Sequence, residues 1–489
     1  MENYIELLIG RLRNLTLNAM GVDRDLYKLL SDKDVGAVKA MMQNRDEEVC
    51  QAISEYNPDS HKVNNRPNKV RKNRQPYESE KLPRSRQRYI NEVELFFLLG
   101  KPIKWKNDTA TDSSTDMAFL AYNRFLRELR FDTLFRQAKR LAGAETESAI
   151  IFHFQNDNGK PSAIAKVISY SKGYRLRPLF DQWGILRAFG YGYNIKKGNA
   201  VIEHFDIETP TTIFECESAK VGWKVTAKPN PTGKINAIYI RQEKAWNGVQ
   251  SRIDREEYID SKAADSNNYF ADPKLMITAD MVKTLADRET AGELLTMYGT
   301  ESRAEYLSPP EYSTMKETEK NDLNRSILFD TFTPDFSFDT MKGLGTLSGD
   351  ALRRAMTLGY IKRDNIMEIY NELVDRAKNL ILAIMKHITH PELSAEIDKI
   401  KISHEFSEPF TEDSQTSWTA ISELYVKGVA SLETVVKMLA LTDAPSEEVE
   451  RIRDNKLRNV MLSMRAAEES QKLIDGSASS ETDIQDNTR

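Results

Sequence analysis

The residues with the clearest capacity for chemistry form a basic run at positions 62–88. Ten lysines and arginines in this run stand against only two acids, Glu78 and Glu80. Three prolines, Pro67, Pro76 and Pro83, disfavour a helix, so we expect an extended arm. Such an arm can bind phosphates or an acidic protein surface. The alternative is a solvated arm that packs along a neighbouring subunit, and the sequence leaves both interpretations open.

Signatures of catalysis are weak along the whole chain. The sequence has no G-x-x-x-x-G-K-[ST] phosphate loop, and Gly343-x-Gly345 is too short and wrongly placed to cradle a nucleotide. His387 and His390 stand three residues apart without a further ligand cluster, so we expect no metal site and no cofactor. We therefore predict that the chain is not an enzyme. A metal-dependent nucleic-acid enzyme needs convergent carboxylates, which sequence alone does not exclude.

Composition indicates a protein with a substantial core. The 489 residues are 40% apolar and 29% charged, with room for two to four domains. No apolar run approaches the roughly 20 residues of a membrane span, and no signal peptide opens the chain, so secretion is not expected. Cys50 and Cys216 fit ordinary thiols in a reducing compartment. The net charge of −5 gives no global basic footprint for tight nucleic-acid binding.

The elements that must position these residues begin with helices and continue with strands. We predict helices within residues 1–60, at 86–99 and at 116–141. From residue 148 the apolar period changes to two, which indicates strands at 149–154, 163–170, 200–207, 211–216, 221–227 and 235–240. Turn residues at 156–161 and 231–233 are typical of hairpins. The sequence therefore predicts an α+β region with a largely antiparallel sheet.

Two polar helices are predicted at 244–270 and 311–330. The module between them, residues 274–310, is expected to be compact and to hold a short helix from Thr278. Both helices have thin apolar faces and would make a poor hairpin in a monomer. In a ring of copies, each pair could pack against the next pair.

The clearest helix signal is an apolar stripe over residues 366–388, where apolar side chains recur at steps of three and four. Ser348 is a candidate N-cap for its start, and Gly359 with the polar residues 362–365 suggests a bend. The preceding residues 333–347 contain Pro334 and two glycines and are expected to form a mobile loop.

The C-terminal part is predicted to contain one strand and three helices. The strand, at 399–406, could return to the sheet. The helices lie at 417–427, at 431–441 with Ser431 as N-cap, and at 447–464. From residue 468 the chain is acidic and serine-rich, so we expect it to be disordered.

Three motifs carry a family resemblance. Residues 90–103 (INEVELFFLLGKPI) match a helix that ends in a Gly-Lys-Pro-Ile turn. Residues 347–352 (LSGDAL) match a Ser-Gly-x-Ala-Leu helix start. Residues 428–434 (GVASLET), with 447–452 (EEVERI), match a Ser-x-Glu-Thr segment and an acidic helix. In this order, over roughly residues 60–465, the chain resembles the portal proteins of tailed double-stranded DNA bacteriophages, in the siphophage-type branch.

The resemblance implies a largely helical α+β portal fold with an α/β wing, a two-helix stem, a small clip, a long helix and a C-terminal helical crown. On that pattern, residues 1–244 form the N-terminal helical region and wing, and residues 245–270 and 311–333 form the stem. The remaining parts are the clip at 271–310, the tunnel loop at 334–349, the long helix at 350–388, the returning strand at 389–412, the crown at 413–465 and the disordered acidic tail at 466–489.

The resemblance also implies function and partners. Portals form dodecameric rings at one capsid vertex of the virion, assembled in the host cytoplasm, through which double-stranded DNA is packaged and ejected. Implied partners are further copies of the chain, terminase, the head-completion adaptor, and the major capsid and scaffolding proteins, with no membrane. A metal-dependent nucleic-acid enzyme and another minor head or scaffold protein remain the alternatives.

Candidate site residues follow from the same pattern. The tunnel loop would line the channel with Phe336, Phe338, Met341, Lys342, Gly343, Leu344 and Gly345. Lys342 could make one transient phosphate contact per subunit, and the stem residues Lys316 and Lys320 could add a second row; simple solvation or intersubunit salt bridges are the alternative. The apolar loop residues could instead pack against neighbouring loops. Adaptor-binding candidates in the clip are Leu294, Leu295, Met297 and Tyr298.

Overall fold

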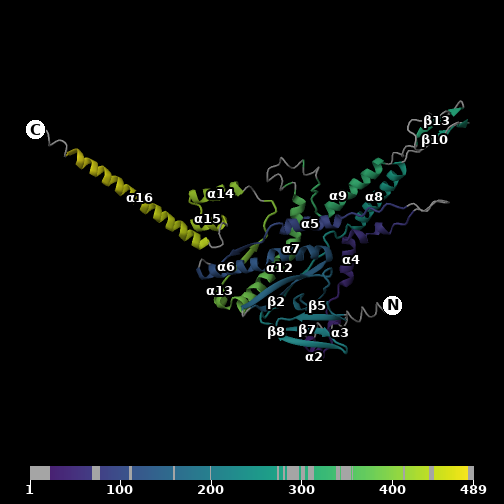
Figure 1. Cartoon of the computed structure of the whole chain (residues 1–489), viewed down its shortest axis with the longest axis horizontal. Helices are drawn as coiled ribbons and strands as arrows, with labels where there is room; N and C mark the ends of the chain where they lie inside the picture. The colour runs from purple at the N-terminus through teal and green to yellow at the C-terminus, as the bar shows by residue number, and fades with distance from the viewer. Residues whose placement is uncertain are drawn as a thin grey trace.

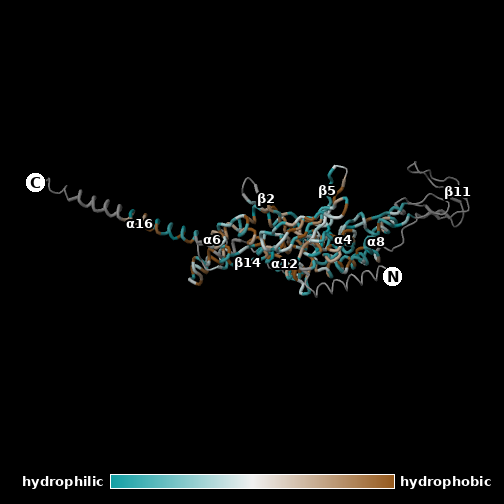
Figure 2. The backbone as a smooth tube through the Cα atoms, turned by 90° about the horizontal axis from the view of Figure 1, so that it is seen from below, coloured by the Kyte–Doolittle hydropathy of each residue, from teal (hydrophilic) through white to brown (hydrophobic). Residues whose placement is uncertain are grey.

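The computed structural model describes residues 22–68, 78–109, 113–157, 160–198, 200–271, 275–278, 281–282, 297–298, 303–306, 313–337, 342, 354, 356–410, 414–439 and 445–482. Helices and strands form a mixed body, with the pair of α8 (Gln250–Ala271) and α9 (Ser313–Asp330) projecting from one side and α16 (Pro445–Thr482) from the other (Figure 1). Coloured by hydropathy, α16 is largely hydrophilic where it leaves the body (Figure 2). Within the described residues we find no helix with the length and hydropathy to cross a bilayer.

Helix α5 (Arg86–Leu99) lies at the centre of the body and has the predicted bounds. Its Leu95, Leu98 and Leu99 belong to the largest apolar cluster, together with residues of the helices at 113–145 and 357–384 and of the strands at 147–168 and 237–241. Its Phe97, on another face, belongs to a separate aromatic cluster. Helix α5 thus contacts both the large apolar cluster and the aromatic cluster, which includes Phe336 of the loop that follows α9.

The prediction of one helix at 116–141 is wrong. The structure has two helices, α6 (Ser113–Glu128) and α7 (Phe131–Glu145). Between them Arg130 adopts a left-handed backbone conformation with φ of 53°, which ends a right-handed helix. The break allows Phe131 and Phe135 of α7 to stack and to enter the core.

Two antiparallel sheets make up most of the strand content. One has the order β3-β2-β9, with β2 (Glu147–Asp157) in the middle, and the other has the order β4-β5-β6-β7-β8. The remaining bounds are β3 (Lys160–Ile168), β4 (Arg175–Phe180), β5 (Leu186–Lys197), β6 (Ala200–Glu208), β7 (Thr212–Ser218), β8 (Trp223–Pro229) and β9 (Ala237–Arg241). The predicted antiparallel arrangement is confirmed. The predicted hairpin at 231–233 is wrong, because this turn carries the chain from β8 of one sheet to β9 of the other.

Strands β4 and β5 were not predicted. Pro178 lies within β4, and Gly190 and Gly192 lie within β5. Proline and glycine are depleted in strands, so the sequence did not indicate a strand at either place. In the fold Gly190 is required for packing, because a Cβ there would lie 2.8 Å from both Met42 Sδ and a ring carbon of Phe205. Helices α2 (Val22–Ser31) and α3 (Val35–Met41) cover this sheet.

The two polar helices are α8 (Gln250–Ala271) and α9 (Ser313–Asp330). Between them β10 (Leu275–Thr278) pairs with β13 (Arg303–Tyr306), and β11 (Met281–Val282) pairs with β12 (Met297–Tyr298). The predicted helix from Thr278 is wrong in the described part, because Thr278 ends a strand and the next described residues, 281–282, form another.

Helix α12 (Thr357–Ile384) is continuous through Gly359 and residues 362–365, so no break occurs where a bend was expected. Gly359 instead lies against the ring of Phe97, with no room for a Cβ. The expected N-cap, Ser348, lies outside the described residues. Beyond α12, β14 (Ile402–Glu405) pairs with β1 (Lys104–Asn107), so this strand joins neither large sheet.

Three helices close the chain: α14 (Ser414–Val426), α15 (Leu432–Leu439) and α16 (Pro445–Thr482). The predicted cap of α15 is confirmed, because Ser431 Oγ accepts the Thr434 N–H at 3.2 Å. The predicted disorder of the tail is wrong up to Thr482, because α16 continues that far, and residues 483–489 lie outside the described residues.

Candidate functional site

The α8–α9 pair is an antiparallel hairpin held by ion pairs along its length. Arg252 of α8 pairs with Asp330 near the body, and Lys320 of α9 lies 2.9 Å from an Asp260 oxygen farther out. Near the body, Ile327 of α9 joins Trp246 and other apolar residues in a small buried cluster. The hairpin therefore forms within one chain, which the thin apolar faces did not lead us to expect.

A third segment completes this hairpin. Residues 61–66 and 78–86, here called the strap, lie along α8. The backbone N–H groups of Glu80, Leu82 and Arg84 donate to side chains of α8 at 2.8 Å, 3.0 Å and 2.8 Å. Their acceptors are Asp265, Ser261 and Glu257, respectively.

The regular spacing of these bonds has a geometric cause. Two residues of extended chain advance about 6.6 Å, and four residues of α-helix advance about 6.0 Å. Every second N–H of the strap therefore meets the next turn of α8. The polar acceptors at 257, 261 and 265 are spaced by four, which places them in one row on the helix.

Basic side chains of the strap neutralise acids of α8. Arg66 pairs with Asp265, and Arg86 Nη2 lies 2.8 Å from a Glu256 oxygen. Both carboxylate side chains are at most 1% exposed. The basic run thus contacts an acidic protein surface, one of the two predicted options, and that surface belongs to its own chain. Residues 69–77 of the run lie outside the described residues.

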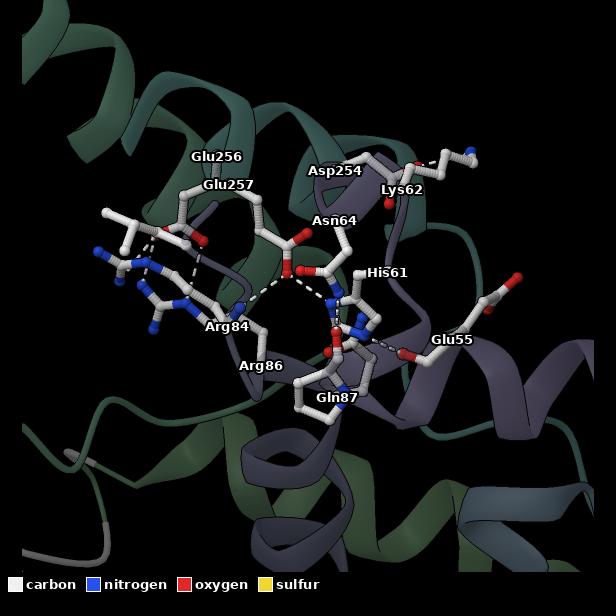
Figure 3. A network of polar contacts seen from close by, with 12 residues as sticks. Glu55, His61, Lys62, Asn64, Arg84, Arg86, Gln87, Asp254, Glu256 and Glu257 are labelled. Carbon is white, nitrogen blue, oxygen red and sulfur yellow. Dashed lines mark hydrogen bonds and ion pairs between the residues drawn. The ribbon is translucent and has the colours of Figure 1, made fainter. Parts of the chain in front are cut away.

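His61 lies at the centre of this polar network (Figure 3). Its Nδ1 is 2.6 Å from Glu257 Oε1, and its Nε2 is 2.7 Å from the Glu55 carbonyl oxygen. The His61 and Glu257 side chains are both 0% exposed. Burial by itself would lower the pKa of His61, but the hydrogen bond and the charge of Glu257 raise this pKa above its ordinary value. The strap and α8 thus meet at a buried, charge-assisted hydrogen bond.

The start of the loop after α9 is fixed on α5. Tyr89 Oη donates to the Pro334 carbonyl at 2.7 Å and accepts the Phe336 N–H at 2.8 Å. The Phe336 ring stacks on Phe97, with 6.3 Å between ring centroids. Phe336 thus packs against Phe97 of its own subunit, and its place along a channel stays a prediction.

A buried charge network joins α9, α5 and α12 at the same place. Lys362 Nζ donates to the Thr331 carbonyl at 3.0 Å and to Thr333 Oγ1 at 3.2 Å, and it lies 3.7 Å from Glu94 Oε2. Burial lowers the pKa of Lys362 to about 8, although Glu94 opposes this shift. Burial would raise the pKa of Glu94, but Lys139 and Lys362 lower it. The chain on both sides of the loop is thus tied to the core.

The other predicted site residues are only partly described. Lys342 is helical and exposed. Lys316 and Lys320 are half-buried, and Lys320 is paired with Asp260 within the subunit. Met297 and Tyr298 form β12 in the small module. Phe338, Met341, Gly343, Leu344, Gly345, Leu294 and Leu295 lie outside the described residues.

Sequence reasoning missed the strap contacts and the loop base. The repeat of Glu257, Ser261 and Asp265 at steps of four was a usable signal for a partner along α8. No comparable signal marked Tyr89 or Lys362, because one tyrosine in an apolar helix and one lysine in a polar run are ordinary residues. Among the described residues, no group of three or more His, Cys, Asp and Glu side chains could hold a metal ion.

Comparison with known protein families gives a match over most of the chain. The family model described as phage portal protein, SPP1 Gp6-like, matches residues 38–460. Among solved structures, a chain of the "Neck of native GTA particle computed with C12 symmetry" is similar at 11% sequence identity and a TM-score of 0.41. That match covers 73% of this chain and 91% of the other. A search of curated proteins found no match. The matched residues of the family model include α5, the α8–α9 hairpin and α12.

Proposed function

The chain belongs to the family of SPP1 Gp6-like phage portal proteins, and from this premise we propose that it forms a dodecameric ring at one capsid vertex. Double-stranded DNA is packaged and ejected through the central channel of this ring. The family is structural, so the chain is a virion structural protein of a bacteriophage. The observation that carries the proposal is the family match over residues 38–460.

The projecting hairpin supports the assignment of a stem. In the proposed ring α8 and α9 form the stem, and the small paired strands between them belong to the clip that meets the head-completion adaptor, with Met297 and Tyr298 as candidate contacts. The ion pairs and the strap hold each proposed stem together within its own subunit. The sheets form the wing, and α14 to α16 form the crown.

The loop that follows α9 is the proposed tunnel loop. Its start is fixed by Tyr89, and the backbone before it is held by Lys362. Phe336 is then an anchor, and the channel-lining residues lie beyond it, with Lys342 as the proposed transient phosphate contact. A sliding duplex requires weak contacts, because affinity rises with each phosphate that a cation neutralises. One lysine per subunit meets this condition better than a basic groove.

The proposed partners are terminase, the head-completion adaptor, and the major capsid and scaffolding proteins, all meeting the ring in the virion or during assembly in the host cytoplasm. We propose no catalytic activity and no cofactor. The basic strap does not serve as a DNA-binding arm in its described part, because its arginines are paired with α8.

Native mass spectrometry with negative-stain class averages tests the ring. A closed ring with a central hole and about twelve copies is expected. A monomer or dimer at every salt and protein concentration, also with scaffolding protein present, would contradict the proposal. Divalent-metal-dependent DNA cleavage by the purified chain would favour the nuclease alternative instead.

Deletion of residues 338–346 tests the loop. Assembly should remain intact, because the hairpin, the strap and the loop base lie outside the deletion, while DNA packaging or retention should fail. Removal of residues 483–489 is the control deletion and should leave both properties unchanged. Loss of rings in the loop deletion would show that the loop is needed for assembly.

A further inference from the structure

The hydrogen bonds of His61 define which of its nitrogens carry protons. A carbonyl oxygen only accepts, so Nε2, 2.7 Å from the Glu55 carbonyl, must carry a proton. Glu257 Oε1 already accepts the Arg84 N–H and lies 2.6 Å from Nδ1. With an ionised carboxylate at this position, Nδ1 must also carry a proton. With Glu257 ionised, the contact is therefore an imidazolium–carboxylate pair.

Other charged groups surround this pair on three sides. From α8, Asp254 accepts Lys62 of the strap at 2.7 Å. From α4 (Asp46–Tyr56), the Glu55 carboxylate is occupied by Lys244 at 2.5 Å and by the Trp246 indole at 2.9 Å. From the strap, Arg84 pairs with Asp260 and Glu256. These neighbours are committed to other partners, so none of them can replace the Nδ1 proton opposite Glu257.

Loss of that proton would place a nitrogen lone pair opposite a carboxylate oxygen. The ring would have to turn or Glu257 would have to move, and Glu257 Oε1 is the acceptor that holds the Arg84 N–H. The second oxygen of Glu257 is buried without a hydrogen-bond partner in the described part of the chain.

We propose that His61 is a proton-dependent switch that holds the strap on α8: the imidazolium keeps Glu257 beneath Arg84, and loss of the Nδ1 proton releases the strap from this end of the hairpin. The proposal concerns one subunit and does not depend on ring formation. Whether the strap is bound to α8 at this end of the hairpin then depends on pH.

The direction of the pH response follows from the pKa of His61, which the charge and hydrogen bond of Glu257 raise in the folded state against the opposing effect of burial. A raised folded-state pKa means that the stabilisation is fully present below the unfolded value of about 6.5. The stabilisation is lost as pH rises through the higher folded value. The strap should thus be tight in weak acid and loosen in weak base.

Hydrogen–deuterium exchange at pH 6 to 9, corrected for intrinsic rates, tests the switch on the full-length chain at one oligomeric state. Protection of peptides covering residues 78–86 should fall by up to about tenfold per pH unit between the unfolded value of about 6.5 and the folded pKa, and should level off above the folded pKa. In His61→Gln the same peptides should be less protected at pH 6 and should lose the pH dependence. His404→Gln, whose ring lies near Asp375 and far from the strap in sequence, is the matched control and should behave like the unsubstituted protein.

Glu257→Gln provides a second, independent test. Its amide oxygen can still accept the Arg84 N–H, but the charge that raises the pKa of His61 is gone, so the transition should move to lower pH. Circular dichroism confirms that each variant is folded, and if His61→Gln is not, the unsubstituted protein and Glu257→Gln decide alone. Protection that does not change with pH, or a midpoint that does not move in Glu257→Gln, would overturn the proposal.

Discussion

Substitution of Tyr89 by Phe should release the start of the proposed tunnel loop. The change removes only the hydroxyl, which donates to the Pro334 carbonyl at 2.7 Å and accepts the Phe336 N–H at 2.8 Å. Each bond contributes about 1 kcal/mol, and more where a buried group is left without a partner, so we expect a local loss of about 2 kcal/mol. This corresponds to a roughly 30-fold larger open population of the loop start.

Hydrogen exchange of the Phe336 amide measures this opening directly, because that amide is one of the two bonded groups. Global unfolding should change by at most the same amount, since the ring of residue 89 still packs against Phe336 and its neighbours. Tyr258→Phe is the control, because Tyr258 lies exposed on α8 and its ring faces cations. If the Phe336 amide exchanges at the same rate in Tyr89→Phe, the hydroxyl does not hold the loop, and our account of the loop base is wrong.

Three further substitutions test other parts of the fold. Burial raises the pKa of Glu208 from 4.5 to about 7. The unsubstituted protein should therefore lose about 3 kcal/mol of stability as pH rises between these two values. Glu208→Gln should lack this loss, so that in urea unfolding its stability relative to the unsubstituted protein is higher at pH 8 than at pH 5. Gly359→Ala would force a Cβ into the ring of Phe97 and should cost 1–3 kcal/mol, read as a lower melting temperature, whereas an unchanged temperature would show that α12 can move aside. Arg130→Gly relieves a left-handed residue at an exposed turn and should raise stability by roughly 0.5–1 kcal/mol in the same assay; a loss would mean that the arginine side chain contributes more than the strain costs.

Local sequence pattern was sufficient where neighbouring residues in the chain set the ends of an element. The bounds of α5 were predicted because its apolar residues end at Gly100, and the cap of α15 was predicted from Ser431. Prediction failed where a distant contact decides the residue type. Gly190 looks like a strand breaker but makes room for Phe205, and Gly359 looks like a bend but makes room for Phe97.

The same limit applies to charge. The sequence predicted a polar helix at 244–270 and an extended basic arm with several possible partners, because sequence does not show that the acids of the helix and the bases of the arm neutralise each other. In the fold Glu256 and Glu257 are 0% exposed and Asp265 is 3% exposed, so these charges are internal to the subunit.

The pairing of strap and α8 also explains why a polar helix can project from the body. A hairpin with thin apolar faces gains little from burial, and its stability must come from hydrogen bonds and charge pairs along its sides. Removal of one partner from a buried pair costs about 3–5 kcal/mol, because the remaining charge is left without compensation. Loss of Arg66 would thus remove the cation paired with Asp265, and loss of Arg86 would remove one of the cations paired with Glu256. The strap and α8 therefore form one structural unit, in which the bases of the strap and the acids of α8 stabilise each other.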